Sequence, residues 1–194
     1  MDFLNYTCFV EGLASEASKV DFNARLLTGI LGLTGEAAEC VEVYKIAKFE
    51  YEAFDFSRFV DECSDLMWYV AFTTIAIETP LALIIEANKS DIKPQVDKKD
   101  PVFDDYVLLE AVMNVSWSTG KCADIVKKYL FHGKPFNKEK FIETLNEVVK
   151  HISGMMAIFG LSIQDVVDAN VLKLKDRYKT GKFTFEEFMK KETV

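Results

Sequence analysis

Apolar residues recur at helical spacing along most of the chain, and this periodicity restricts the possible fold more than any other feature. In the first half they form two stripes: Leu26, Leu27, Ile30, Leu33, Ala37, Val41 and Tyr44, and then Phe59, Cys63, Leu66, Val70, Thr73 and Ile77. The second half has Val112, Val115, Ala123 and Val126, and then Phe141, Leu145, Val148, Ile152, Met155 and Phe159. Such stripes are typical of long amphipathic helices, and no segment shows a convincing strand alternation. The sequence therefore predicts an all-α fold.

The chain also resembles itself at an offset of 82 residues. Without a gap, this offset places Cys40 on Cys122 and Phe59 on Phe141, and helix and loop signals coincide throughout. A charged stretch at 90–101 holds two of the four prolines and separates the halves. We expect a helical bundle of two tandem repeats packed as an internal pseudo-dimer. The expected bounds are 1–93 and 102–183 for the repeats, 94–101 for the linker and 184–194 for a C-terminal tail.

Charge and hydropathy exclude some classes of partner. The 194 residues carry a net charge of −8, with a pI near 4.9, which argues against a protein that binds nucleic acid non-specifically through a basic face. No apolar run approaches the roughly 18 to 20 residues of a membrane span, and the first residues lack the basic start of a signal peptide. The four cysteines are scattered without a C-x-x-C pair. These features predict a cytoplasmic protein with no membrane partner.

Four acids form two pairs at i, i+3 spacing within the predicted helices of the first half. Glu36 pairs with Glu39, and Glu62 pairs with Asp65. Residues three apart lie on one helix face, so all four carboxylates converge if the two helices pack antiparallel. Four close carboxylates repel one another unless positive charge lies among them. A hard divalent cation with oxygen ligands suits such a group, and we expect Mg²⁺ there, with Mn²⁺ as a substitute.

The residues around these acids resemble a known family. The segments are Gly-Glu-Ala-Ala-Glu at 35–39, Asp-Glu-Cys-Ser-Asp-Leu-Met-Trp-Tyr at 61–69 and Glu-Ala-Asn at 86–88. The second half adds Ile-Val-Lys-Lys-Tyr-Leu-Phe-His-Gly-Lys-Pro at 125–135 and Asn-Val-Leu-Lys-Leu-Lys-Asp-Arg-Tyr at 170–178. These motifs are similar to those of the all-α nucleoside triphosphate pyrophosphohydrolases of the MazG-like and dimeric dUTPase superfamily, particularly phage-encoded members. The resemblance implies two tandem MazG-like repeats and Mg²⁺-dependent hydrolysis of a nucleoside triphosphate to monophosphate and pyrophosphate, in the host cytoplasm if the chain is phage-encoded.

The two halves depart from the family pattern in complementary ways. At the 82-residue offset, the four acid positions carry Ser118, Lys121, Thr144 and Glu147, so the second half has lost three of its four acids. The family's basic pair after the Asn survives as Lys173 and Arg177 but becomes Asp91 and Gln95 in the first half. Each half retains what the other has lost, which predicts one composite site. Its acids would hold the metal and perform catalysis, and Lys173 and Arg177 would bind phosphates.

For several further substrate-binding candidates, a purely structural role is also possible. Lys45 is a weaker phosphate candidate, together with Lys127, Lys128 and Lys134. Asn88 and Asn170 can bind sugar or phosphate, or simply cap helices. Trp68 and Tyr69 can line a base pocket, although aromatic residues at helical spacing are more often core. We expect Gly35 to permit close packing of helices.

Three functions fit the sequence. The first is the nucleoside triphosphate pyrophosphohydrolase, acting on a nucleotide substrate as a monomer or a homodimer of the tandem chain. The second is a protein that binds or sequesters a nucleotide without hydrolysing it, because the second half is degenerate. The third is an interaction protein in which the repeat survives only for packing.

Overall fold

The computed structural model describes residues 1–50, 53–86 and 105–189, and this part of the chain is helical without any strand. The all-α prediction is confirmed. The helices are α1 (Phe3–Leu13), a short 3-10 turn (Glu16–Lys19), α2 (Phe22–Phe49), α3 (Phe56–Ala76), α4 (Leu81–Glu86), α5 (Asp105–His132), α6 (Lys138–Ile158), α7 (Ile163–Arg177) and α8 (Phe185–Met189).

Short polar side chains fix where five of these helices begin. Asp2, Asp21, Asp55 and Asn137 each accept a hydrogen bond from the backbone N–H three residues later, at 2.8 to 2.9 Å. Such a bond satisfies one of the four N–H groups that have no partner in the first turn of a helix. Ser162 starts α7 with a reciprocal arrangement, because Asp165 also accepts from the Ser162 backbone at 2.8 Å.

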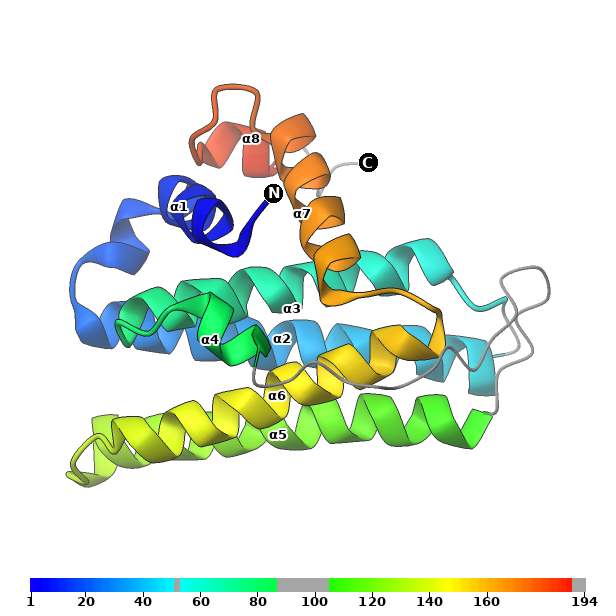
Figure 1. Ribbon diagram of the computed structural model, residues 1–194, viewed down its shortest axis with the longest axis horizontal. Helices are drawn as coiled ribbons and strands as arrows, with labels where there is room; N and C mark the ends of the chain where they lie inside the picture. Colours follow the sequence, from blue (N-terminus) through cyan, green and yellow to red (C-terminus); the bar gives the residue numbers. More distant parts are fainter. Residues whose placement is uncertain (51–52, 87–104, 190–194) are drawn as a thin grey trace.

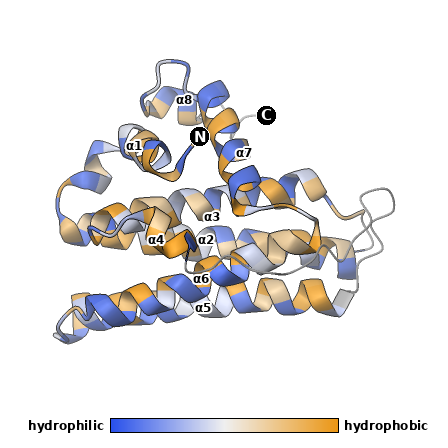
Figure 2. Cartoon of the chain, viewed as in Figure 1, coloured by the Kyte–Doolittle hydropathy of each residue, from blue (hydrophilic) through white to orange (hydrophobic). Residues whose placement is uncertain are grey.

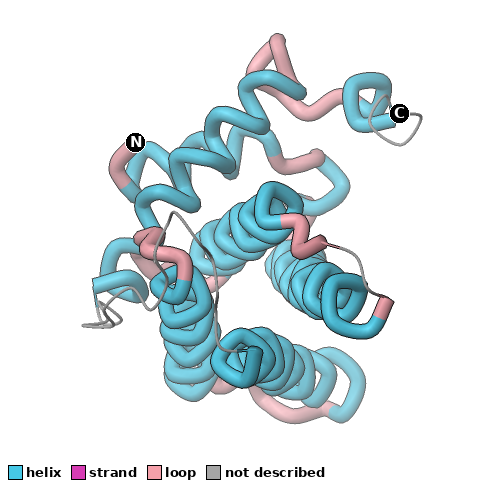
Figure 3. Tube along the Cα trace, turned by 90° about the vertical axis from the view of Figure 1, so that its right-hand side faces the viewer, coloured by secondary structure: helices cyan, strands magenta, loops and turns pink. Residues whose placement is uncertain are grey.

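The four long helices α2, α3, α5 and α6 run side by side and form the body of the molecule (Figures 1 and 3). Helix α2 contacts both α3 and α5, and α5 contacts α6. Helices α1 and α7 lie on the other side of α3, and both contact it. Helix α3 is therefore covered on several sides, which explains why more than half of its residues are buried.

One main apolar core joins both halves of the chain. Phe59 of α3 and Phe141 of α6, which match at the 82-residue offset, are both fully buried in it. Hydrophobic and hydrophilic residues alternate along the long helices (Figure 2), and most residues of the apolar stripes are buried, although Leu27 is exposed. Burying one such large side chain contributes about 1.5 to 3 kcal/mol, so this shared core accounts for much of the cohesion between the halves.

The helices of the two halves correspond in length and position at about the 82-residue offset found in the sequence. Helices α3 and α6 both have 21 residues and begin 82 residues apart, and α2 and α5 both have 28 residues. The helix that follows the long pair in each half contacts the opposite half, because α4 contacts α6 and α7 contacts α3. A pseudo-two-fold relation would produce this exchange, and the pseudo-dimer stays a prediction. The predicted linker at 94–101 lies outside the described residues, and the predicted tail contains α8.

Membrane spanning was tested by length and composition. No single helix in the described part is long and apolar enough to cross a membrane, and α6 with α7 reach that composition only together, across a 91° bend.

Helices α2 and α3 approach closely where two glycines face bulky neighbours. A Cβ atom on Gly29 would lie 2.3 Å from Thr73 Oγ1, and one on Gly32 would lie 2.1 Å from the Tyr69 ring. A Cβ atom on Gly35 would meet nothing within 4 Å, so the expectation that Gly35 permits close packing was wrong. The missing side chains at 29 and 32 set the separation of these two helices.

We predict that Gly29→Ala lowers the free energy of unfolding by about 1 to 3 kcal/mol, because the added methyl group overpacks a buried contact. Thr73 is fully buried and β-branched, so its side chain has little freedom to move away. Chemical denaturation measures the effect. Gly35→Ala is the matched control and should be neutral or raise stability by up to about 1 kcal/mol, because alanine favours helix. Equal destabilisation by both variants, or no relief when Thr73→Ala is added to Gly29→Ala, would contradict the close-approach explanation.

Candidate functional site

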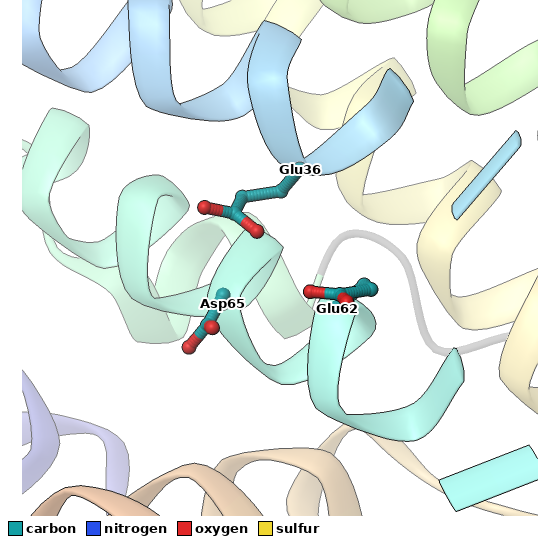
Figure 4. A group of neighbouring side chains, drawn as sticks. All are labelled: Glu36, Glu62 and Asp65. Carbon is teal, nitrogen blue, oxygen red and sulfur yellow. The ribbon is translucent and has the colours of Figure 1, made fainter. Parts of the chain in front are cut away.

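Three of the four predicted acids meet between α2 and α3. Glu36 projects from α2, and Glu62 and Asp65 project from α3 (Figure 4). One carboxylate oxygen from each lies within 4.8 Å of those of the other two. Glu39, one turn further along α2, is exposed and stands outside this group, although it lines the same cavity. The convergence predicted from the i, i+3 spacing thus holds for three acids.

Burial and mutual repulsion make these acids hard to ionise together. The pKa of Glu36 is raised to about 8, chiefly by burial and then by the charges of Asp65, Glu39 and Glu62. The pKa of Glu62 is also raised, first by burial and then by Glu39. Arg58 opposes this, because its Nε donates to Glu62 Oε1 at 3.3 Å while its guanidinium also pairs with Glu42. The cluster therefore favours a bound positive charge.

Helix α7 supplies one such charge to Asp65. The Lys173 ammonium lies 2.8 Å from Asp65 Oδ1, and both side chains are largely shielded from water. Lys173 also donates to the backbone carbonyl of Asp61 at 3.2 Å. This cation lowers the pKa of Glu36, against the stronger effects that raise it. A residue of the second half thus takes part in the acid cluster of the first half.

A buried chain of hydrogen bonds orients the same carboxylate. Asn170 Nδ2 donates to Asp65 Oδ1 at 3.0 Å and to Ser64 Oγ at 3.3 Å. Its own Oδ1 accepts from the Tyr6 hydroxyl of α1 at 2.9 Å. Asn170 is fully buried and its amide already bonds to protein groups, so it positions Asp65 and is shielded from any ligand. Nothing in the sequence pattern linked Tyr6 to this site.

The acids open into a cavity of about 400 Å³ between α2, α3, α7 and the chain that follows α7. The cavity is lined by Leu13, Glu36, Glu39, Glu62, Asp65, Trp68, Tyr69, Leu174, Arg177, Tyr178, Phe183 and Phe188. Five of the lining residues are aromatic: Trp68, Tyr69, Tyr178, Phe183 and Phe188. Sequence reasoning missed Tyr178, Phe183 and Phe188, whose only signal was a cluster of aromatic residues after the last predicted helix.

The remaining predicted residues divide into those near the cavity and those away from it. Arg177 lines the cavity, and no carboxylate of the described residues pairs with it. Trp68 and Tyr69 are half-buried and line it too, with Trp68 stacked on Phe72 at 5.4 Å between ring centroids. Lys45 is exposed, pairs with Glu50 at 2.7 Å and does not line the cavity. Asn88 lies outside the described residues.

The chemistry of the donor set fits a hard cation. Three carboxylates from two helices, with a shared cavity beside them, provide the oxygen ligands that Mg²⁺ takes while leaving room for other ligands. Glu36, Glu62 and Asp65 would hold the ion, and Glu39 is close enough to raise the pKa values of Glu36 and Glu62 by its charge.

Fold and site together define an all-α protein with one carboxylate-lined cavity built from both halves of the chain. No protein-family model, curated protein or solved structure matches this chain.

We predict that Glu36→Gln stabilises the protein at alkaline pH in the presence of a chelator. The unfolded carboxyl ionises near its ordinary pKa of 4.5, whereas the folded one keeps its proton until about pH 8. The folded state therefore binds more protons, and this group's contribution to stability falls as pH rises between these values. At pH 9 the variant should be more stable by about 1 to 3 kcal/mol, less than the full shift implies because the carboxyl is partly open to water.

Denaturation curves from pH 4 to pH 9 measure this difference. The exposed Glu143→Gln on α6 is the matched control and should leave the pH dependence unchanged. A pH profile that is identical in wild type and Glu36→Gln would show that Glu36 is ionised in the folded protein at neutral pH.

Proposed function

We propose that the protein is a Mg²⁺-dependent nucleoside triphosphate pyrophosphohydrolase that releases a nucleoside monophosphate and pyrophosphate. One observation carries the proposal: Glu36, Glu62 and Asp65 converge within 4.8 Å at the edge of a cavity whose other walls hold Arg177 and aromatic rings. This supports the function that the sequence motifs imply. A carboxylate cluster for a cation, a guanidinium for phosphates and aromatic faces for a base are the parts that such a substrate requires.

The negative charge of the phosphates opposes attack by a nucleophile and must be neutralised. Bound by the three acids, Mg²⁺ would neutralise the phosphate oxygens and make the attacked phosphorus more electrophilic. Arg177 then binds a phosphate of the substrate, because its guanidinium offers paired donors and has no carboxylate partner among the described residues. Lys173 acts differently from the prediction, because its ammonium is engaged by Asp65 and holds that carboxylate in place.

A proton acceptor is the second requirement, and Glu36 suits it best. Burial and the neighbouring acids raise the pKa of the ion-free Glu36 carboxyl to about 8, and a bound cation would lower this pKa, which would keep Glu36 ionised and able to accept a proton near neutral pH. It also has no hydrogen-bond donor among the described residues, whereas Glu62 accepts from Arg58 and Asp65 from Lys173 and Asn170. Glu36 would take the proton of the attacking water.

The aromatic part of the cavity is suited to a base. Trp68 and Tyr69 lie on α3 beside the acids, and Tyr178, Phe183 and Phe188 face them from the C-terminal segment. Aromatic rings supply apolar contact area and stack on planar groups. A volume of about 400 Å³ falls within the range of small-molecule sites.

A second candidate function is nucleotide binding without hydrolysis. Its support is the 2.8 Å contact of Lys173 with Asp65, which places a protein cation where a metal would otherwise balance the charge. In that case a nucleotide would bind through Arg177 and the aromatic rings, and chelation would not weaken binding.

The decisive experiment is an assay of pyrophosphate release across a panel of nucleoside and deoxynucleoside triphosphates with Mg²⁺. We expect turnover of at least one nucleotide, with loss of about 100-fold or more in kcat for Glu36→Gln and Glu62→Gln, because each removes a group that acts on the reacting phosphate. Glu143→Gln should retain wild-type activity. Tight binding without turnover, insensitive to chelation, would favour the sequestering function. Silence in both binding and turnover would reject both.

Arg177 provides a separate test of the composite site. We expect Arg177→Ala to raise KM about ten-fold, because it removes a charge-assisted contact with a phosphate, and Arg177→Lys to recover part of the loss. Lys175→Ala, two residues away and exposed on the same helix, is the control and should change neither KM nor kcat. Steady-state kinetics with the preferred nucleotide measure both constants. Unchanged kinetics for Arg177→Ala would place the phosphates on the first half alone.

A further inference from the structure

A second cavity, of about 670 Å³, lies between α5, α6 and the loop that joins them. It is lined by Ser116, Trp117, Gly120, Lys121, Asp124, Ile125, Lys128, Lys134, Pro135, Asn137, Lys140 and Thr144. None of these residues lines the carboxylate cavity, so the two cavities are separate.

The lining carries a surplus of positive charge in an acidic protein. Lys128 pairs with Asp124 at 2.5 Å, and Lys121 pairs with Glu147 at 2.5 Å. Lys134 and Lys140 are both exposed, and no carboxylate of the described residues pairs with either. Against a net charge of −8 for the whole chain, this is a local site that attracts anions.

The cavity overlaps the positions that correspond to the acids of the first half. Lys121 stands where the first half has Glu39, and Thr144 stands where it has Glu62. The one acid that remains, Glu147, is neutralised by Lys121. Corresponding positions of the two halves thus carry acids suited to a cation in the first half and residues suited to an anion in the second half.

The loop between α5 and α6 holds its lysine in a defined place. Gly133 adopts a φ of +66°, a conformation that favours glycine, and lets the chain turn at the end of α5. The backbone N–H of Lys134 then donates to the Lys128 carbonyl at 3.2 Å, and Pro135 follows. The backbones of residues 128 and 134 are therefore held side by side, and both lysines line the cavity.

An exposed tryptophan borders the lysines. The Trp117 side chain is 58% exposed on a well-formed helix, and the Lys121 ammonium lies 4.4 Å from its ring centroid. Large aromatic side chains are usually buried, and an exposed one beside basic residues provides a face on which a planar group can stack.

We propose that this cavity is a metal-independent binding site for a nucleotide, with the phosphates held by Lys128, Lys134 and Lys140 and the base stacked on Trp117. Lysine ammonium groups bind phosphate as point charges without a metal. The size of the cavity suits a ligand of this class. The site would act as a second nucleotide site beside the carboxylate cavity, and the proposal does not depend on hydrolysis at the first.

Isothermal titration calorimetry on the full chain in excess EDTA tests the proposal. The ligands are a deoxynucleoside triphosphate panel, inorganic pyrophosphate, an uncharged deoxynucleoside and a short single-stranded oligonucleotide. We expect saturable binding of a nucleotide that weakens at least about ten-fold in Lys134→Gln/Lys140→Gln, because two charge-assisted contacts are lost. Both lysines are exposed, so this variant should fold normally, which its melting curve checks. Lys150→Gln/Lys175→Gln is the control: it also removes two exposed lysines, neither of which lines a cavity, and should bind like wild type.

Two further variants assign the binding to this cavity. Arg177→Ala should leave the binding in EDTA unchanged, whereas a loss there would place the ligand in the carboxylate cavity and overturn the proposal. Trp117→Ala should weaken nucleotide binding while leaving pyrophosphate binding unchanged, which separates base stacking from phosphate attraction. No binding by any nucleotide in EDTA, equal binding by the lysine variant, or stronger binding of the oligonucleotide would also overturn it. Hydrolysis at the first site is measured with Mg²⁺, so each proposal can fail without the other.

Discussion

The close approach of α2 and α3 is the constraint on which the site depends. Gly29 and Gly32 leave no Cβ atom between the helices, and Thr73 and the Tyr69 ring occupy the space. At this separation, the Glu36 carboxylate of α2 lies close to the Glu62 and Asp65 carboxylates of α3. The interface also leaves the Thr73 hydroxyl buried, with no hydrogen-bond partner in the described part of the chain. An unsatisfied buried hydroxyl costs about 1 to 3 kcal/mol, so the surrounding apolar core must offset it.

Bringing the acids together makes their ionisation unfavourable, and groups from the other half of the chain reduce this effect. Carboxylates that are partly shielded from water resist ionisation, as the raised pKa values of Glu36 and Glu62 show. Helix α7 brings the Lys173 ammonium and the Asn170 amide to Asp65, and α1 brings the Tyr6 hydroxyl to Asn170. Removing one partner of a shielded ion pair destabilises a protein more than the pair itself stabilises it. The docking of α7 on α3 is thus linked to the electrostatics of the acid cluster as well as to apolar packing.

The sequence predicted the elements well and the tertiary details less well, for physical reasons. Apolar periodicity reports which face of a helix is buried, so the long helices and the repeated bounds of α3 and α6 could be read in advance. The i, i+3 rule placed acids on one face but could not show that Glu39, about 4.5 Å further along the axis, would stand outside the cluster.

The tertiary contacts could not be predicted in the same way. Among glycines at 29, 32 and 35, only the crossing of the helices decides which ones face a neighbour. Asn170 was a candidate for ligand binding or helix capping, and only the packing of α1 and α3 around it shows that its amide is engaged by Tyr6, Ser64 and Asp65. The helix α8 has five residues, too few for a periodic signal, so the contribution of Phe188 to the cavity was hidden.

The two halves of the chain differ more in their charged residues than in the lengths of their helices. At the 82-residue offset, Lys121 and Thr144 correspond to Glu39 and Glu62 of the first half, and Lys173 of the second half contacts Asp65. A cluster of acids needs a cation and a cluster of lysines needs an anion, so neither group is neutral by itself. A second acid cluster would add self-repulsion to a chain that already carries a net charge of −8. The core supports both groups in the same way, because Phe59 and Phe141 are buried alike. Helices packed on one core can therefore carry groups of opposite charge, because most of the charged side chains are exposed or half-buried and the packing beneath them does not depend on their charge.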